Sequence, residues 1–519
     1  MADLSRVREL LIGAGYTVDG VRELLGPVAG GALARDEIVP ALRATGGGSP
    51  LEVLTRLFWL QVPVDAASIR TDDLVAAGLA EVSGGEVRAR LRVEPLETVG
   101  WSGNSNGGGG SGDGRSGGGD SGDGRSGVGG SGGGIGGGHA GYVVSDLKVR
   151  PGAGAVPAAD HVVGAGGASA SLARLVIHRP VDNMLDVGTG CGVQAVHLAG
   201  RNPDARITAT DVNPRALELA AMSFALSGDP AREAGEIELL EGSLLEPVRG
   251  RRYDLIVSNP PFVVAPSEGR RFTYRESGLP GDDFCRRLVA DAPAHLAEGG
   301  YCQLLANWLH VEGVPWEERV GSWVDGCDAW IVQRDVQDPS EYAELWLRDS
   351  CEAGTPEYRA RYEAWLDHFA RLGVTGIGFG WITLRRGGRA GVRIEELRHA
   401  VDQPVGAYVD DVLDGFARAE EFSTACGQAL RAAPGLVQEQ IGPPGAEDPE
   451  RLVLRQTGRL RRAAGVGTVE AGLAGVCDGS LPLAPLLDAI AQLTGMDPTQ
   501  VRAHADTVLP ALIADGFFT

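Results

Sequence analysis

A short motif at residues 259–262 follows the apolar run YDLIVS and combines groups that can hold a planar nitrogen. Two successive prolines cannot donate hydrogen bonds to a sheet, so they are a costly way to end a strand unless they build a site. The Asn259 side-chain oxygen and the Pro260 carbonyl can each accept one N–H, which aims the nitrogen lone pair at an electrophile. Phe262 can stack on the planar group and favour a passing positive charge. The predicted catalytic residues are Asn259, Pro260, Pro261 and Phe262.

A second cluster lies earlier, where the run LDVGTGCG (185–192) places three glycines directly after a predicted strand. Glycines there let the backbone turn sharply and approach a ligand closely. Asp211 ends the next predicted strand, 21 residues after Gly190, where a carboxylate can accept hydrogen bonds from two ribose hydroxyls. A nicotinamide dehydrogenase shares this acid but prefers GxGxxG, which sets a helix N-terminus against a pyrophosphate. The GxGxG spacing and the proline pair argue against that class.

At this point the sequence resembles the class I methyltransferases, whose LDxGxGxG motif is matched by LDVGTGCG. The resemblance implies S-adenosyl-L-methionine as cofactor, with Asp186 near the methionine amino group and Asp211 on the ribose. It also implies that residues 188–192 wrap the amino-acid and ribose portions. Ser243 and Leu244 would border the adenine, although the family more often has Asp or Asn at the place of Ser243. The implied cofactor-binding residues are Asp186, Gly188, Thr189, Gly190, Cys191, Gly192, Asp211, Ser243, Leu244 and Asn259.

The Asn-Pro-Pro-aromatic element resembles two branches of this superfamily, the release-factor glutamine N5-methyltransferases and the ribosomal-RNA guanine-N2 methyltransferases, and adenine-N6 DNA methyltransferases share it. The glutamine branch usually has Tyr where this chain has Phe262, and the guanine branch usually has His where this chain has Val263. The segment 270–284 resembles a glycine-rich stretch of the glutamine branch. Its arginines can clamp an acidic partner or a phosphate, or belong to a solvated lid. They are Arg270, Arg271 and Arg275.

We therefore expect N-methylation of a macromolecule, with a protein glutamine amide as the first choice and ribosomal RNA as the alternative. An alternative of another class is a non-catalytic module that only binds the cofactor. The presence of Asp186, Gly190, Asp211 and Asn259 in one chain argues against such a relic.

The elements that must position these residues alternate between strands and helices from about 142 to 389, which is the rhythm of a doubly wound parallel sheet. We predict a Rossmann-like α/β domain there, with a mostly parallel seven-stranded sheet whose last two strands are partly antiparallel. A charged helical insertion, 357–373, precedes the last strand, and a helix is expected over 216–227. The expected strands are 184–188, 206–211, 237–242, 253–259, 301–307, 328–336 and 376–386.

The segments on either side of this domain have different sequence patterns. Residues 1–98 show helices followed by a possible two-stranded wing, 80–82 and 87–95, and so resemble a winged-helix module. This module carries 10 arginines against 14 acidic residues, which favours protein docking or a structural role over DNA reading. Residues 102–141 are dominated by Gly, Ser and Asp, so we expect a flexible linker. Residues 390–519, with a possible strand over 452–458 and a helix over 483–495, are expected to form a C-terminal accessory domain.

Composition sets outer limits on the function. The net charge of −22 argues mildly against nonspecific binding to nucleic acid. The seven cysteines are scattered singly, without zinc spacing, so we expect reduced thiols and no metal. The start of the chain lacks a signal-like apolar segment, and no run approaches the length of a membrane span. We therefore expect a cytoplasmic protein without a membrane partner.

Overall fold

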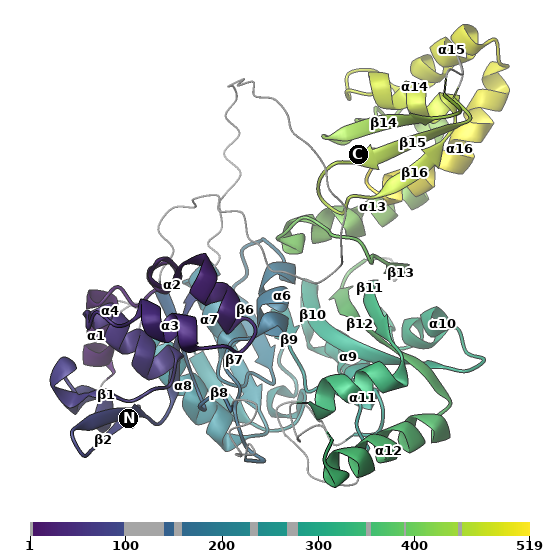
Figure 1. Cartoon of the computed structure of the whole chain (residues 1–519). Coiled ribbons are helices and arrows are strands. Elements are labelled where there is room, and N and C mark those ends of the chain that lie inside the picture. Colours follow the sequence, from purple (N-terminus) through teal and green to yellow (C-terminus); the bar gives the residue numbers. More distant parts are fainter. Residues whose placement is uncertain are drawn as a thin grey trace.

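A central eight-stranded sheet organises the chain (Figure 1). The computed structural model describes residues 4–97, 140–149, 158–228, 237–266, 279–348, 354–388, 391–444 and 449–519. In spatial order the strands are β13 (Val392–Glu396), β11 (Asp328–Gln337), β12 (Val374–Arg385), β10 (Leu296–Val311), β9 (Tyr253–Ser258), β6 (Asn183–Val187), β7 (Arg206–Asp211) and β8 (Ile237–Glu241). Neighbouring strands are parallel except at β12, which runs antiparallel to β10 and β11. The Rossmann-like α/β fold predicted from the sequence is confirmed.

The inner strands of the sheet are buried on both faces, as their nearly continuous apolar sequences require. On β9, Leu255 and Val257 face one hydrophobic core and Ile256 faces the other, because successive side chains of a strand point to opposite sides. One face is covered by α9 and α10, and the other by α6, α7 and α13. The bounds of these helices are α6 (Gly167–Leu175), α7 (Val193–Arg201), α9 (Asp283–His295), α10 (Trp316–Gly321) and α13 (Val409–Glu421), and α8 (Pro214–Ser227) follows β7.

The order of the strands reverses next to β6. The chain leaves β6 toward β7 and β8, then returns to the other side of β6 as β9. Such a reversal opens a crevice at the carboxyl ends of the strands, where open α/β sheets bind ligands. Val187, the last residue of β6, pairs with Ser258 on β9 and with Thr210 on β7. The motifs that follow these three strands therefore begin at the same edge of the sheet.

The predicted count of seven strands is wrong by one. The additional strand, β13, pairs in parallel with β11 from Ala329↔Val392 to Gln333↔Glu396. Its sequence, VRIEE, has no apolar run, and none of its residues is fully buried. Because the strand is held by polar contacts to other parts of the chain, hydrophobic patterning gave no signal for it. Its position also joins the central sheet to residues beyond the boundary expected at 390.

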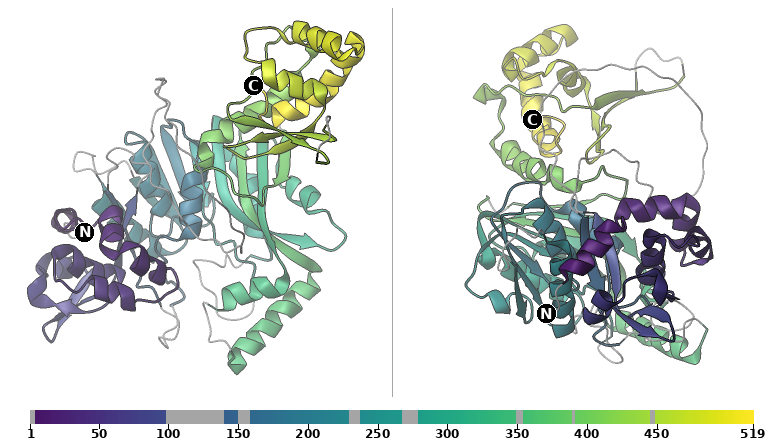
Figure 2. Two further views of the ribbon diagram at one scale, coloured as in Figure 1. Left: turned by 45° about the horizontal axis from the view of Figure 1, so that its top comes forward. Right: turned by 90° about the vertical axis from the view of Figure 1, so that its left-hand side faces the viewer.

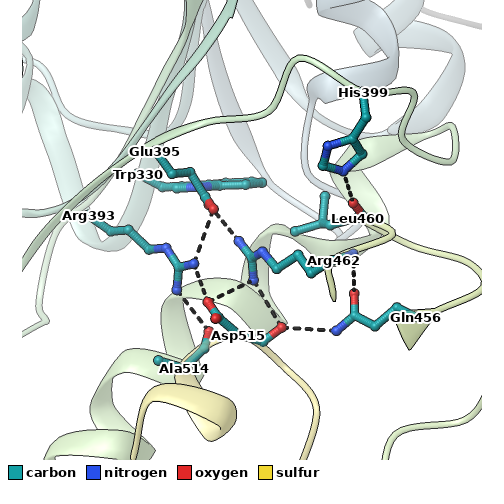
Figure 3. A network of polar contacts seen from close by, with 9 residues as sticks. All are labelled: Trp330, Arg393, Glu395, His399, Gln456, Leu460, Arg462, Ala514 and Asp515. Atoms are coloured by element: carbon teal, nitrogen blue, oxygen red, sulfur yellow. Dashed lines mark hydrogen bonds and ion pairs between the residues drawn. The ribbon is translucent and has the colours of Figure 1, made fainter. Parts of the chain in front are cut away.

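Polar contacts bind the C-terminal domain to this edge strand (Figure 3). Glu395 of β13 accepts hydrogen bonds from Trp330 Nε1 at 2.6 Å and from Arg462 at 2.5 Å. Arg393 donates to the same carboxylate at 3.1 Å and also contacts Asp515. Arg462 is 8% exposed, so it contributes a nearly buried charge that these acids neutralise.

The C-terminal domain beyond this contact has a core of its own. Its sheet is antiparallel, in the order β14-β15-β16, and is packed by three helices. Both the strand expected at 452–458 and the helix expected at 483–495 are present as β15 and α15. The elements are β14 (Leu436–Ile441), β15 (Arg451–Gln456), β16 (Ala463–Val466), α14 (Thr468–Val476), α15 (Leu483–Thr494) and α16 (Pro498–Ala514).

The N-terminal part contains helices followed by a small antiparallel sheet, β1-β3-β2. Its hairpin, β2 (Ala80–Ser83) and β3 (Glu86–Ala89), lies where the sequence predicted a wing, and the winged-helix assignment stays a prediction. The helices are α1 (Ser5–Gly13), α2 (Val18–Leu33), α3 (Val39–Ala44), α4 (Pro50–Leu54) continued by the π-helical turn η1 (Thr55–Trp59), and α5 (Asp72–Ala76), while β1 covers Val64–Asp65. The N- and C-terminal parts lie at different ends of the central sheet (Figures 1 and 2).

The run 87–95, which was expected to be one strand of the wing, forms parts of two strands. After β3 the chain forms β4 (Arg92–Glu97), which pairs antiparallel with β5 (Ala140–Ser145), and Glu97 lies opposite Ala140. Serine hydroxyls of α8 bind the β5 backbone, with Val144 N donating to Ser223 Oγ at 2.8 Å. The expected linker lies outside the described residues apart from its last two.

Two helices lie between the last two strands of the predicted seven. They are α11 (Pro339–Leu347) and α12 (Pro356–Arg371), between β11 and β12. Asp338 begins α11 with a capping box that is completed by Glu341. The helix expected over 357–373 is therefore present, with a partner helix that was not predicted. Among the described residues, no helix is both long and apolar enough to cross a membrane.

Candidate active site

The three glycines after β6 adopt backbone angles that favour glycine. Gly188, Gly190 and Gly192 have φ of 71°, 56° and 85°, in the left-handed region that is costly for a residue with a Cβ. The N–H groups of Gly188 and Thr189 both donate to Thr210 O at 2.9 Å, which ties the loop to the end of β7. Gly192 is the N-cap residue of α7. Among the described residues, nothing beyond the chain neighbours lies within 4 Å of a Cβ built on Gly188 or Gly190, so their backbone is uncovered at the carboxyl end of β6.

Asp186 is a buried acid with an unused oxygen. The side chain is 1% exposed, and its Oδ2 accepts a hydrogen bond from Thr189 Oγ1 at 2.7 Å. Its Oδ1 is buried without a hydrogen-bond partner among the described residues. Burial raises the pKa of Asp186 to about 7, although the Thr189 hydroxyl and the Ala195 N–H favour the ionised form. An ammonium group would satisfy this oxygen, as expected for the methionine end of S-adenosylmethionine.

Asp211 closes the other side of the glycine loop. Its Oδ2 accepts from Gly190 N and its Oδ1 accepts from Asn213 N, both at 2.9 Å. Burial raises the pKa of this carboxyl group, which these backbone donors partly offset. Each carboxylate oxygen can accept more than one hydrogen bond, so the side chain can also receive ribose hydroxyls. Asp211 therefore shapes the loop as well as offering a place for the sugar.

A cavity of about 500 Å³ lies next to these residues, with Ser243 and Leu244 in its wall. Leu244 has a φ of 51°, an uncommon conformation for a branched residue, which presents this turn to the cavity. Val212, which follows Asp211, also lines the cavity and is 50% exposed. A half-exposed apolar side chain in the same cavity as Leu244 suits a flat base. Sequence analysis missed Val212, although an apolar residue directly after the acidic strand end was a signal.

Asn259 presents a buried acceptor at the end of β9. Its Oδ1 has no hydrogen-bond partner among the described residues, while its Nδ2 makes a long, 3.5 Å contact to Ser169 Oγ on α6. A buried carbonyl oxygen without a donor is expensive, so this oxygen is available to accept an N–H from a ligand. Ser169 was not predicted, because it lies 90 residues away in the sequence and has no motif around it.

The rest of the motif forms a tight, packed turn. Pro260 O accepts from Phe262 N at 2.8 Å, and one lone pair of this carbonyl remains for a ligand. Phe262 is half-buried and contacts two of the hydrophobic cores, so its ring is held in place by packing. Cys191 contributes backbone to the glycine loop, but its side chain lies in the core of the N-terminal part. The arginines expected at 270, 271 and 275 lie outside the described residues.

The orphan oxygen of Asp186, the left-handed glycines, Asp211 and the cavity beside Leu244 together fit an amino acid joined to a nucleoside. The residues brought together at one edge of the sheet are those that the sequence predicted, with Val212 and Ser169 added. Among the described residues, no group of three or more His, Cys, Asp and Glu side chains could hold a metal ion.

Comparison with known proteins agrees with this geometry. Residues 166–312 match the family "Methyltransferase small domain", and residues 13–90 match a domain of unknown function, DUF7059. A release factor glutamine methyltransferase of Geobacter sulfurreducens is 36% identical over 163 residues, 29% of this chain and 53% of that protein. The corresponding protein of Deinococcus radiodurans is 37% identical over 150 residues, which cover 27% and 51%.

A third relative is a ribosomal protein uL3 glutamine methyltransferase of Bradyrhizobium diazoefficiens, 32% identical over 171 residues, which cover 30% of this chain and 52% of that protein. The chain spans about half the length of these curated relatives. The predicted cofactor, S-adenosylmethionine, is confirmed by the family match. The centre of this chain is therefore a class I S-adenosylmethionine-dependent methyltransferase domain.

Proposed function

We propose that the protein transfers the methyl group of S-adenosylmethionine to the side-chain amide nitrogen of a glutamine in a protein. The observation that carries this proposal is the buried Asn259 Oδ1, which lacks a hydrogen-bond partner among the described residues. Asn259 follows β9, whose last residue pairs with the residue before the glycine loop. An amide nitrogen is a poor nucleophile because its lone pair is delocalised into the carbonyl. A site for it must therefore fix the N–H groups rather than supply a strong base.

Two acceptors of the motif can fix the two N–H groups of the amide. Asn259 Oδ1 accepts one N–H of the amide and the free lone pair of Pro260 O accepts the other, so the nitrogen lone pair points out of the amide plane. Phe262 lies against the planar group. Asp186 pairs with the ammonium of the cofactor and Asp211 binds its ribose, while Val212, Ser243 and Leu244 border the adenine. S-adenosylmethionine would supply the methyl group and leave as S-adenosylhomocysteine, and the methylated nitrogen would release one proton to water. Alignment and electrostatics carry the rate.

A protein acceptor is favoured over ribosomal RNA by two observations. The matched relatives are named for release factors and for ribosomal protein uL3. The chain carries a net charge of −22, which opposes approach of a phosphate backbone. Phe262 is the feature that favours the RNA branch, because the glutamine branch usually has Tyr there. An acceptor of the translation machinery would also agree with the cytoplasmic location predicted from the sequence.

The test is transfer of labelled methyl groups into a cell lysate, followed by digestion with protease or with nuclease. Label that is released by protease and recovered as methylglutamine supports the proposal, and label that is released by nuclease supports the RNA alternative. Asn259→Ala should lower kcat by about 10²-fold, as for loss of a transition-state hydrogen bond, with the Kd for S-adenosylhomocysteine changed by less than about threefold.

Asn183→Ala is the matched control, because this Asn lies at the amino end of β6 and donates to Arg252 O away from the site. It should keep full turnover. Asn259→Asp should also be slow, since a carboxylate beside the cofactor's positive charge favours the ground state. Full turnover by a folded Asn259→Ala protein would remove the assigned role and the nitrogen chemistry with it.

A further inference from the structure

The backbone that follows the catalytic motif is held by a tyrosine hydroxyl from the helical insertion. Val264 N, two residues after Phe262, donates a hydrogen bond to Tyr342 Oη at 3.0 Å. Asn307 Nδ2 on β10 donates to the same oxygen at 3.1 Å. Tyr342 and Val264 are both buried. The hydroxyl thus joins three elements: the motif, the central strand β10 and helix α11.

The ring of Tyr342 is fixed from several sides. It packs against Trp365, Phe369 and Phe379 with ring centroids 6.2, 6.0 and 5.5 Å away. These residues belong to one hydrophobic cluster with Val263 and Val264. Burial raises the pKa of the Tyr342 phenol, so the group stays neutral over the working range of pH. Because the ring is held in place by packing, its hydroxyl is a fixed anchor for the groups that bind it.

Packing accounts for the ring but not for the hydroxyl. A phenylalanine would fill almost the same volume, so packing does not require the oxygen, whereas the Val264 N–H and the Asn307 amide both donate to it. Without it, the buried N–H of Val264 and the amide of Asn307 lose an acceptor. On the other side of Phe262 the backbone is stiffened by Pro260 and Pro261. Phe262 is therefore fixed by prolines before it and by the Tyr342 hydroxyl after it.

We propose that Tyr342 is a positioning residue for methyl transfer, which acts by holding the backbone of residues 262–264 and thereby the ring and carbonyl that orient the acceptor nitrogen. This inference rests on the proposed function for its kinetic consequence. It gives the insertion α11–α12 a role as a support for the motif. A displacement of about 1 Å in such a group can lower turnover by about 10²-fold.

Tyr342→Phe tests the inference, with Tyr362→Phe as the matched control. Tyr362 lies on α12 of the same insertion and its hydroxyl donates to Glu344 at 3.2 Å, away from the motif. For Tyr342→Phe we expect kcat to fall by about 10-fold or more, while KM for the acceptor and Kd for S-adenosylhomocysteine change by less than about threefold. Hydrogen exchange at the Val264 amide should accelerate in Tyr342→Phe and stay unchanged in Tyr362→Phe.

A wild-type kcat in folded Tyr342→Phe protein would overturn the inference, as would a loss of activity that only follows the loss of folded protein. If Tyr342→Phe does not fold, Asn307→Ala removes the other donor to the hydroxyl and should lower kcat without weakening cofactor binding. An unchanged kcat in Asn307→Ala would also overturn the inference. Absence of glutamine methylation by the wild type would reject the proposed function alone, because the exchange of Val264 tests the positioning independently of substrate.

Discussion

Replacing Asp186 with asparagine should make the cofactor-free protein more stable at neutral pH while weakening its binding of the cofactor. Burial raises the pKa of this carboxyl group from its ordinary 3.8 to about 7. At pH values between these two limits the unfolded chain has released the proton and the native protein keeps it. Stability is therefore lost as the pH rises from about 4 to about 7, and the loss is complete above the native pKa.

A rise of the pKa from 3.8 to about 7 corresponds to about 4 kcal/mol at pH 8. The amide introduced by Asp186→Asn would accept the same hydrogen bond from Thr189 and cannot ionise. The difference in unfolding free energy between Asp186→Asn and the wild type should grow by about 1.4 kcal/mol per pH unit between pH 5 and 7, then level off. Urea unfolding of both cofactor-free proteins at pH 5, 6, 7 and 8 measures this difference directly.

The affinity for the cofactor should rise with pH over the range in which the stability falls. An ammonium beside Oδ1 favours the ionised carboxylate, so binding near pH 6 releases up to one proton and affinity rises toward pH 7. Calorimetry in two buffers of different ionisation enthalpy counts that proton. Asp186→Asn should bind S-adenosylhomocysteine about 10- to 100-fold more weakly, for a lost charge-assisted hydrogen bond, and without proton release. The exposed Asp204 provides the control variant, Asp204→Asn. Parallel stability curves for Asp186→Asn and the wild type would refute the reasoning.

Protease cleavage within 98–139 should leave residues 1–97 bound to the rest of the chain in native gel filtration, because β4 and β5 pair across the cut; separation would contradict this. Arg462→Met removes the nearly buried partner of the half-buried Glu395 and should destabilise the C-terminal domain by about 3 kcal/mol in urea unfolding, which a matched exposed substitution, Arg502→Met, should not do. Gly190→Ala forces a Cβ into a left-handed turn and should cost about 1–2 kcal/mol of stability, with weaker binding of S-adenosylhomocysteine as its second readout.

The central strands could be predicted because each is an apolar run that ends in a recognisable motif. The expected 206–211 coincides with β7, and 253–259 differs from β9 by one residue. The site residues at these strand ends followed from the topology, since parallel strands bring their carboxyl ends to one edge. Ser169 and Tyr342 could not be predicted, because each reaches the motif from 78 or more residues away. Such contacts depend on tertiary packing, which leaves no local pattern.

The positions of the two ends of the Gly-rich segment could not be predicted from composition. Gly-rich residues predict a segment with little to bury, but they do not say where its two ends lie. Glu97 and Ala140 pair directly, so the segment between them closes a two-stranded ribbon. For any flexible chain between two fixed ends, halving its length changes the closure free energy by only about 0.6 kcal/mol, so we expect a shorter Gly-rich sequence there to be tolerated.

The ribbon also carries a buried acid toward the methyltransferase domain. Glu94 on β4 is 4% exposed and pairs with Arg92 at 2.8 Å. Its carboxylate lies so close to Gly164 that a Cβ there would be 2.1 Å from Oε2. Gly164 precedes α6, which carries Ser169 against Asn259. Glu94 of the N-terminal part therefore lies against the segment that leads into α6. We expect a shorter sequence between residues 97 and 140 to leave methyl transfer unchanged, and a substitution at Glu94 or Gly164 to lower it.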